Sequence, residues 1–165
     1  MQIEYRVATS QSIKDILDIR VRLVEEDSGL FSPEEKQRFR MANEETLVHN
    51  FAIDSELAIL AYHEQEPIGA CCASLYLVLP GRKLPNGKNA YIQNVYIAPA
   101  YRRKGIGKQL LKMVLQELDA RGYGRITLHA TDMGKNLFVS CGFVEEDTSL
   151  SLLSHKKKST VERRW

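Results

Sequence analysis

A junction between a strand and a helix in the middle of the chain constrains its fold more than any other feature. The apolar, β-branched run that ends at Ala98 predicts a strand. After a turn that carries three consecutive cations, Gly105 and Gly107 open the clearest amphipathic helix of the sequence, predicted over 105–122. Because this helix is apolar along one face only, that face is expected to belong to the core.

Hydrophobic periodicity elsewhere in the chain predicts an α+β domain with a mixed sheet. Further helices are expected over 11–26, 33–51 and 133–141, and strands over 3–8, 57–63, 68–79, 90–98, 125–130 and 143–153. The residues Glu64-Gln65-Glu66-Pro67 are expected to join two of these strands into a hairpin. The 165 residues match one domain, expected over 1–154, followed by a basic tail over 155–165.

Composition excludes several classes of protein. The chain is 44% hydrophobic and 27% charged, which excludes low-complexity and wholly disordered chains. Its longest mostly apolar run, 68–79, is shorter than the about 20 residues of a membrane span, and its N-terminus lacks a signal-peptide pattern. The three cysteines show no metal-binding or disulfide-framework spacing. We therefore expect a cytoplasmic protein with no metal and no membrane partner.

The start of the predicted 105–122 helix has a pattern suited to binding an anion. The first N–H groups of a helix lack carbonyl partners, and the helix dipole favours negative charge there. Glycine also lets a phosphate approach the backbone closely. The cations nearby are Arg102, Arg103, Lys104 and Lys108. The pattern predicts a phosphate-bearing ligand, although the glycine spacing matches neither a P-loop nor a dinucleotide-binding motif.

The spacing of Arg102, Gly105 and Gly107 resembles the Arg/Gln-x-x-Gly-x-Gly/Ala pyrophosphate loop of the GNAT superfamily of acyl-CoA-dependent N-acetyltransferases. The preceding strand end, Val-Tyr-Ile-Ala-Pro, resembles that family as well, and the likeness extends over about residues 90–145. It implies a mostly antiparallel central sheet with flanking helices. In that sheet, the 90–98 and 125–130 strands would be parallel and would splay apart.

The resemblance also implies that acetyl-CoA is the co-substrate and that no metal takes part. Backbone groups near Val95 and Tyr96 would hold the pantetheine arm and polarise the thioester carbonyl. The implied cofactor-binding residues are Val95, Tyr96, Ile97, Arg102, Arg103, Lys104, Gly105, Ile106, Gly107, Lys108, Thr131, Asn136 and Phe138. Thr131 stands where many relatives carry an asparagine that contacts the cofactor.

Phe138 stands where many relatives carry a tyrosine that protonates the leaving thiolate. A thiol of pKa about 8.5 leaves readily without such an acid, whereas an alkylammonium of pKa about 10.4 must lose a proton before it attacks. The reaction therefore depends more on a general base for the amine than on a general acid for the thiolate. His129 is the candidate base, with a packed strand histidine as the alternative. Tyr96 is a second candidate catalytic residue, with packing as its alternative role.

Other polar and reactive residues allow more than one interpretation. Glu25, Glu26 and Asp27 end the predicted first helix and either line an acceptor site or remain solvated charges. Cys141 has no histidine partner by spacing and is expected to be inert. The predicted 33–51 helix and the 80–89 loop are expected to shape the acceptor slot.

The function that the resemblance implies is N-acetyl transfer from acetyl-CoA to a primary amine, on a small molecule rather than a protein, by direct attack in a ternary complex. The alternative is a non-catalytic regulatory module that binds CoA or acyl-CoA. Nucleic-acid binding is not expected, because removing the tail's five basic residues and one acid leaves 18 basic and 20 acidic residues in 1–154. A homodimer is the common default for such a domain.

Overall fold

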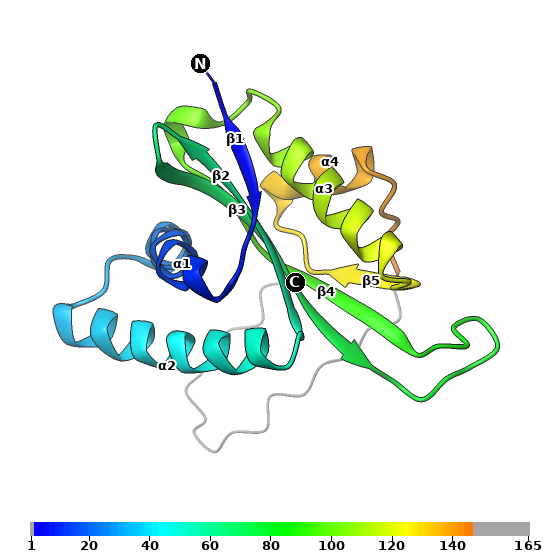
Figure 1. The fold of residues 1–165 in the computed structure, drawn as a ribbon. Helices are drawn as coiled ribbons and strands as arrows, with labels where there is room; N and C mark the ends of the chain where they lie inside the picture. The colour runs from blue at the N-terminus through cyan, green and yellow to red at the C-terminus, as the bar shows by residue number, and fades with distance from the viewer. Residues whose placement is uncertain (1, 147–165) are drawn as a thin grey trace, which may run out of the picture.

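A five-stranded sheet forms the middle layer of the computed structural model, which describes residues 2–146 (Figure 1). The strands are β1 (Glu4–Val7), β2 (Glu56–His63), β3 (Glu66–Leu77), β4 (Lys88–Ile97) and β5 (Arg125–Leu128). They lie side by side in this order, antiparallel except for the parallel pair β4 and β5. The predicted mixed, mostly antiparallel sheet is confirmed.

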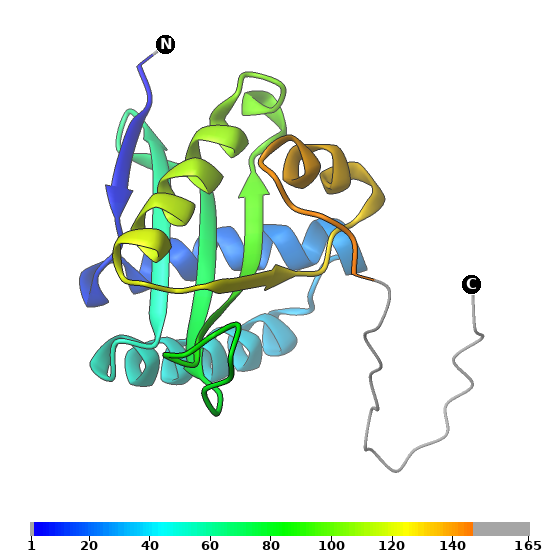
Figure 2. The same cartoon turned by 90° about the vertical axis from the view of Figure 1, so that its right-hand side faces the viewer.

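Helices cover both faces of the sheet (Figures 1 and 2). The helices are α1 (Ile13–Ser28) and α2 (Pro33–Ala52) on one face, and α3 (Ile106–Ala120) and α4 (Asp132–Ser140) on the other, with short 3-10 turns at Ser10–Ser12 and Pro99–Tyr101. Helix α2 begins as predicted, because Ser32 and Glu35 form a capping box around Pro33. Among the described helices, none is long and apolar enough to cross a membrane.

Alternation along the strands divides the core into two layers. On one face, Ile59 of β2 and Cys71 of β3 pack with the apolar stripe of α3 that contains Leu110 and Val114. On the other face, side chains of β2 and β3 pack against α1. Because helices cover both faces, β2 is buried along almost its whole length, which explains its nearly continuous apolar sequence.

The predicted four-residue hairpin turn is wrong in its extent. Only Glu64 and Gln65 form the turn, and both adopt positive φ angles of 48° and 67°. Glu66 and Pro67 already belong to β3 and pair with β2. A two-residue turn with positive φ angles matches the right-handed twist of the flanking strands, which explains its choice over the longer loop.

The final strand predicted over 143–153 is not formed in the part of it that the structure describes. Residues 143–146 have no regular secondary structure, and the rest of that prediction and the basic tail lie outside the described residues. The ring of Phe143 packs edge-on against Phe138, with 6.0 Å between ring centroids. Phe143, the first residue of the predicted strand, therefore packs against α4 instead of pairing in the sheet.

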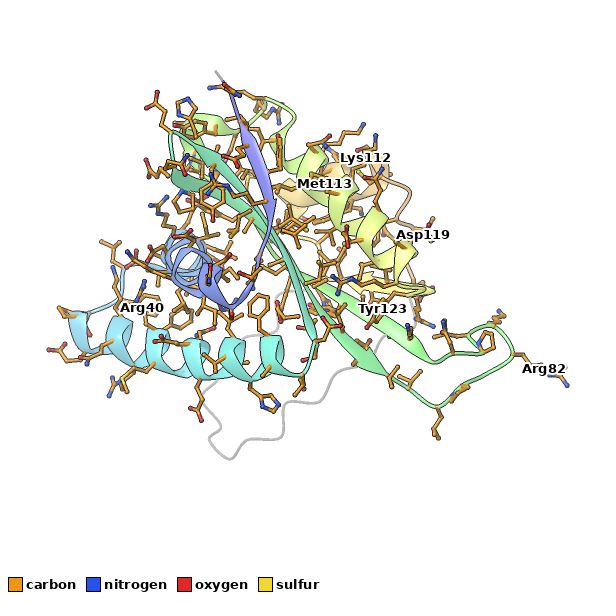
Figure 3. The ribbon with its side chains drawn as sticks, in the orientation of Figure 1. Arg40, Arg82, Lys112, Met113, Asp119 and Tyr123 are labelled. Atoms are coloured by element: carbon orange, nitrogen blue, oxygen red, sulfur yellow. The ribbon has the colours of Figure 1, made fainter. Side chains whose placement is uncertain are left out.

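The connection between β3 and β4 projects away from the body of the molecule, and Arg82 lies at its tip (Figure 3). Its base is tied to the C-terminal end of α3, because Asn86 Nδ2 donates to Gly122 O at 2.8 Å and Lys88 Nζ to Arg121 O at 2.8 Å. The loop expected to shape an acceptor slot therefore contacts the far end of α3 from its N-terminal glycines, about 22 Å away along the helix.

Candidate active site

Helix α3 begins at a loop that leaves backbone amides without helical partners. Gly105 is its N-cap, with a φ angle of 79°, and no side chain caps it within the described residues. The first helical hydrogen bond runs from Gln109 N to Gly105 O at 3.0 Å, so the amides of 106–108 lack a carbonyl one turn earlier. A Cβ at Gly105 would meet no atom within 4 Å. This open loop, residues 102–108, is called the anion cradle below.

The four cations of the anion cradle differ in the contacts that their side chains make. Arg102 turns back toward the sheet, where its Nε donates to Ile97 O at 2.8 Å and its Nη2 contacts Glu26 Oε2 at 2.6 Å. Lys104 Nζ donates to Ala100 O at 2.9 Å. Arg103 and Lys108 are exposed and make no ion pair with another described residue. The structure thus leaves Arg103 and Lys108 available to a ligand and engages Arg102 in the protein itself.

Beside the anion cradle, β4 separates from β5. The two strands pair only from Asn89 with Arg125 to Ile92 with Leu128, whereas β4 continues to Ile97. Residues 93–97 therefore have no partner on β5. An extended ligand can pair with this free strand edge as an added strand does.

The free part of β4 also contains a bulge, formed by Asn94 and Val95 and called the β4 bulge below. Pairing with β3 passes from Cys72 opposite Gln93 to Ala70 opposite Tyr96, so two residues of β4 stand opposite one of β3. Asn94 adopts a positive φ angle of 54°. Such a bulge turns backbone groups out of the regular ladder, next to the edge that β5 leaves free.

Arg20 of α1 reaches the β4 bulge from the opposite layer. Its Nη1 donates to Asn94 Oδ1, and its Nε donates to Asn43 Oδ1 of α2. The guanidinium also lies over the ring of Phe39, 5.5 Å from its centroid. One half-buried side chain therefore joins α1, α2 and β4.

His129 follows the last residue of β5, where the two parallel strands separate. Its Nδ1 lies 2.8 Å from the hydroxyl of Tyr91, and its side chain is exposed. Continuing the register from Ile92 and Leu128 places His129 level with Gln93 on the α1 face of the sheet. If His129 Nδ1–H donates to Tyr91, Nε2 carries the free lone pair that a base requires.

Tyr96 lies three residues beyond Gln93 on β4, and no hydrogen bond joins it to His129 among the described residues. The Tyr96 side chain is buried on the α1 face, and the Arg102 guanidinium lies 5.7 Å from its ring centroid. Burial, followed by the charge of Glu26, raises the pKa of Tyr96. The phenol therefore stays protonated near neutral pH and cannot take a proton from an amine.

Helix α4, which carries or adjoins the remaining predicted cofactor residues, packs beside the start of α3. Leu137 of α4 lies close enough that a Cβ on Gly107 would be 3.5 Å from it. Thr131 caps α4, accepting from Gly134 N at 3.2 Å, so its hydroxyl has a structural partner. Asn136 is exposed. Phe138 is buried in the core beneath α3 and offers no proton to a thiolate.

A groove of about 370 Å³ runs along α3 toward the end of α4. Its lining residues are Lys108, Lys112, Leu115, Gln116, Asp119, Ser140 and Cys141. Figure 3 shows Lys112 and Asp119 along the outer side of α3. The groove begins where the anion cradle ends, and it combines cationic and apolar walls.

The acidic residues at the end of α1 are neither free nor grouped around a cavity. Glu25 Oε1 contacts Lys36 Nζ of α2 at 2.6 Å, and Glu26 contacts Arg102. Glu25 is mostly buried and Glu26 is exposed, so only Glu26 matches a solvated helix-end charge, and both side chains tie α1 to its neighbours. Asp27 is exposed. Among the described residues, no cluster of three histidine, cysteine or acidic side chains is suited to a metal.

Sequence reasoning missed a buried carboxyl group on the face of the sheet that α1 covers. Glu56 begins β2 and is 5% exposed, with its Oε2 accepting from Asn50 Nδ2 at 3.2 Å. Burial raises the pKa of Glu56 to about 7, although Asn50 and the charge of Arg20 lower it. The only sequence signal for a buried carboxyl group was an acid, Glu56, directly before the apolar run of 57–62. The same pattern is equally typical of an exposed loop that ends where a strand begins.

Solved structures described as acetyltransferases share the fold of this chain. The structure of a predicted acetyltransferase with acetyl-CoA from Clostridium acetobutylicum aligns with a TM-score of 0.80 at 22% identity, covering 92% of this chain and 96% of that one. A GCN5-related N-acetyltransferase from Ralstonia eutropha aligns with a TM-score of 0.79 at 21% identity, over 93% and 100% of the two chains. These similarities define the fold.

The sequence itself defines the family. Residues 20–143 match the model of the acetyltransferase (GNAT) family, and the chain belongs to that family. The bovine thialysine N-epsilon-acetyltransferase is 30% identical over 70 residues, which are 42% of this chain and 41% of that protein. The match thus spans about two fifths of the length of this relative.

Proposed function

We propose that this chain transfers the acetyl group of acetyl-CoA to a primary amine by direct attack in a ternary complex. The observation that carries the proposal is the open start of α3 directly beside the free edge of β4. Together they offer amide groups for a pyrophosphate and a strand edge for the amide-containing pantetheine arm. The groove along α3 adds Lys108 and Lys112, which suit the 3′-phosphate of the same molecule.

The proposed reaction requires a base and a group that stabilises the developing negative charge. The amine nitrogen bonds to the acetyl carbon, the carbon–sulfur bond breaks, and the amine proton passes to a base. A backbone N–H at Val95 or Tyr96 would stabilise the negative charge that develops on the carbonyl oxygen. Buried Phe138 supplies no proton, so the thiolate leaves unaided, which its pKa of about 8.5 allows.

The acceptor side of the site is the α1 face of the sheet, where His129 and the β4 bulge lie. The bovine relative is named for acetylating the side-chain amine of thialysine, an amino acid. We therefore place small molecules with a primary amine ahead of proteins as acceptors. A regulatory module that binds acetyl-CoA without turnover is the second candidate. It is favoured by Phe138, whose side chain has no hydroxyl group to protonate a leaving thiolate.

A thiol-release assay with a panel of amines tests the proposal. Release of free CoA that depends on both acetyl-CoA and an amine supports transfer. Saturable binding of acetyl-CoA without release by any amine would support the regulatory module instead. Failure of the intact protein to bind acetyl-CoA in a calorimetric titration would contradict both.

We expect His129→Gln to lower kcat at least tenfold at pH 7, because general-base catalysis contributes at least that much to proton transfer. Tyr91→Phe is the matched control, since it removes only the hydroxyl partner of His129 and should retain most of the rate. A kcat of His129→Gln equal to that of wild type would remove His129 from the mechanism.

We expect Arg102→Met to change the Kd for acetyl-CoA by less than about fivefold, because Arg102 contacts Ile97 O and Glu26 instead of open space. Its lost backbone hydrogen bond should cost about 1 kcal/mol of stability. The partly exposed ion pair with Glu26 adds about 0–1 kcal/mol, as Glu26→Gln should show separately. A hundredfold loss of affinity would mean that Arg102 contacts the phosphates directly.

A further inference from the structure

The contacts of Arg20 lead to an inference about how the reaction site is held together, and it rests on the proposed acetyl transfer. We propose that Arg20 is a positioning residue that fixes the β4 bulge and so aims the backbone N–H groups of 95–96 at the thioester carbonyl. Arg20 lies in the middle of α1, on the opposite layer from the anion cradle. Its contacts with Asn94 and Asn43 join both helices of that layer to the bulge.

The β4 bulge is a place where the strand needs outside support. On one side, β5 has already separated, because its last pair is Ile92 with Leu128. On the other side, the register with β3 shifts by one residue. Asn94 also adopts a φ angle of 54°, a left-handed conformation that asparagine adopts more readily than other non-glycine residues, but still at some cost. A hydrogen bond to its side chain, donated by Arg20, counters that cost.

Arg20 is suited to this task because its surroundings restrain it. Its Nε is held by Asn43, and Asn43 Nδ2 in turn donates to the backbone carbonyl of Phe39 at 2.7 Å. The Phe39 ring packs beside the guanidinium. These contacts hold the guanidinium between α2 and the bulge. A shift of about 1 Å in a catalytic group is enough to cost on the order of a hundredfold in rate.

The first experiment compares Arg20→Met with Arg22→Met. Both arginines are half-buried on α1, but Arg22 contacts Pro67 O and Glu66 at the β2–β3 hairpin. We expect Arg20→Met to lower kcat at least tenfold while the Kd for CoA, which lacks the acetyl carbonyl, stays within twofold of wild type. The ratio of Kd for CoA to Kd for acetyl-CoA should fall toward one. Arg22→Met should change neither quantity, and Arg20→Lys should restore part of the rate.

A second experiment uses Asn94. Asn94→Ala removes the hydrogen-bond acceptor and keeps the unfavourable φ angle, so it should resemble Arg20→Met. Asn94→Gly permits the same φ angle without a side chain and should retain more of the rate than Asn94→Ala. If Arg20 acts through the bulge, adding Arg20→Met to Asn94→Gly should lower kcat less than it does in wild type. Fully additive losses would overturn the proposal.

A third measurement separates this proposal from the proposed function. Amide hydrogen exchange in a peptide spanning 91–97 should be at least tenfold faster in Arg20→Met than in Arg22→Met, whether or not any amine is acetylated. Equal exchange in the two variants would overturn the positioning role, and so would an unchanged kcat with only a lower Tm. Absence of turnover in wild type, with the expected difference in exchange, would overturn the proposed function and leave the structural coupling intact.

Discussion

Replacing Gly105 by glutamate should weaken the binding of acetyl-CoA at least a hundredfold. A side chain at this position would project into the open space of the anion cradle, where no protein atom lies within 4 Å. Its carboxylate would meet the phosphates of the ligand. Two like charges at about 4 Å repel by about 4 kcal/mol in a medium of effective dielectric constant 20, and each 1.4 kcal/mol is about tenfold in Kd.

Gly105→Gln is the matched control for that variant. Both substitutions place a long side chain at a φ angle of 79°, so both carry the same backbone strain of roughly 1 kcal/mol. Only the glutamate adds negative charge. Calorimetric titration with acetyl-CoA should therefore show a large difference between the two variants at equal Tm, reduced at high salt. Equal Kd values would mean that the phosphates bind elsewhere.

Glu56→Gln should make the protein more stable at pH 8 by about 3 kcal/mol, while its stability at pH 4.5 remains near that of wild type. Burial raises the pKa of Glu56 from 4.5 to about 7. Between these values the folded protein binds more protons than the unfolded chain, so its stability falls as the pH rises from about 4.5 to 7. Each pKa unit corresponds to about 1.4 kcal/mol, and the neutral glutamine avoids this loss.

Thermal unfolding at several pH values measures this effect. A gain of about 3 kcal/mol corresponds to roughly 6–12 °C in Tm for a domain of this size. Glu44→Gln, at an exposed position of α2, should keep the wild-type dependence on pH. The pH 8 stability of Glu56→Gln would instead fall if Glu56 remained ionised in a favourable contact with Arg20.

Local chemistry explains which parts of the fold were predictable. The Ser32–Pro33 start of α2, the apolar stripe of α3 and the glycines of the anion cradle all depend on neighbours within a few residues. Their side chains and backbone angles determine these features wherever the element packs. The hairpin was predicted, but its two-residue length at Glu64 and Gln65 was not, because neither residue type signals a positive φ angle.

The same distinction between local and long-range interactions applies to the candidate site. The anion cradle was predictable because amides at the start of a helix attract anions in any fold. The turn of Arg102 toward Glu26 was not, because its partner lies 76 positions earlier in the chain. For the same reason, no pattern indicated that Arg20 meets Asn94, 74 positions later.

The sequence by itself determined most of the order of the elements, the membership of the family and the glycine-containing start of α3 where we propose that an anion binds, since periodicity, capping and glycine act locally. Only the tertiary structure decided which cations are paired within the protein, where β4 and β5 separate, and which carboxyl group is buried. Those outcomes depend on contacts between distant segments. Desolvation of Glu56 and the tether from Arg20 to the β4 bulge arise only when α1, α2 and the sheet are packed together.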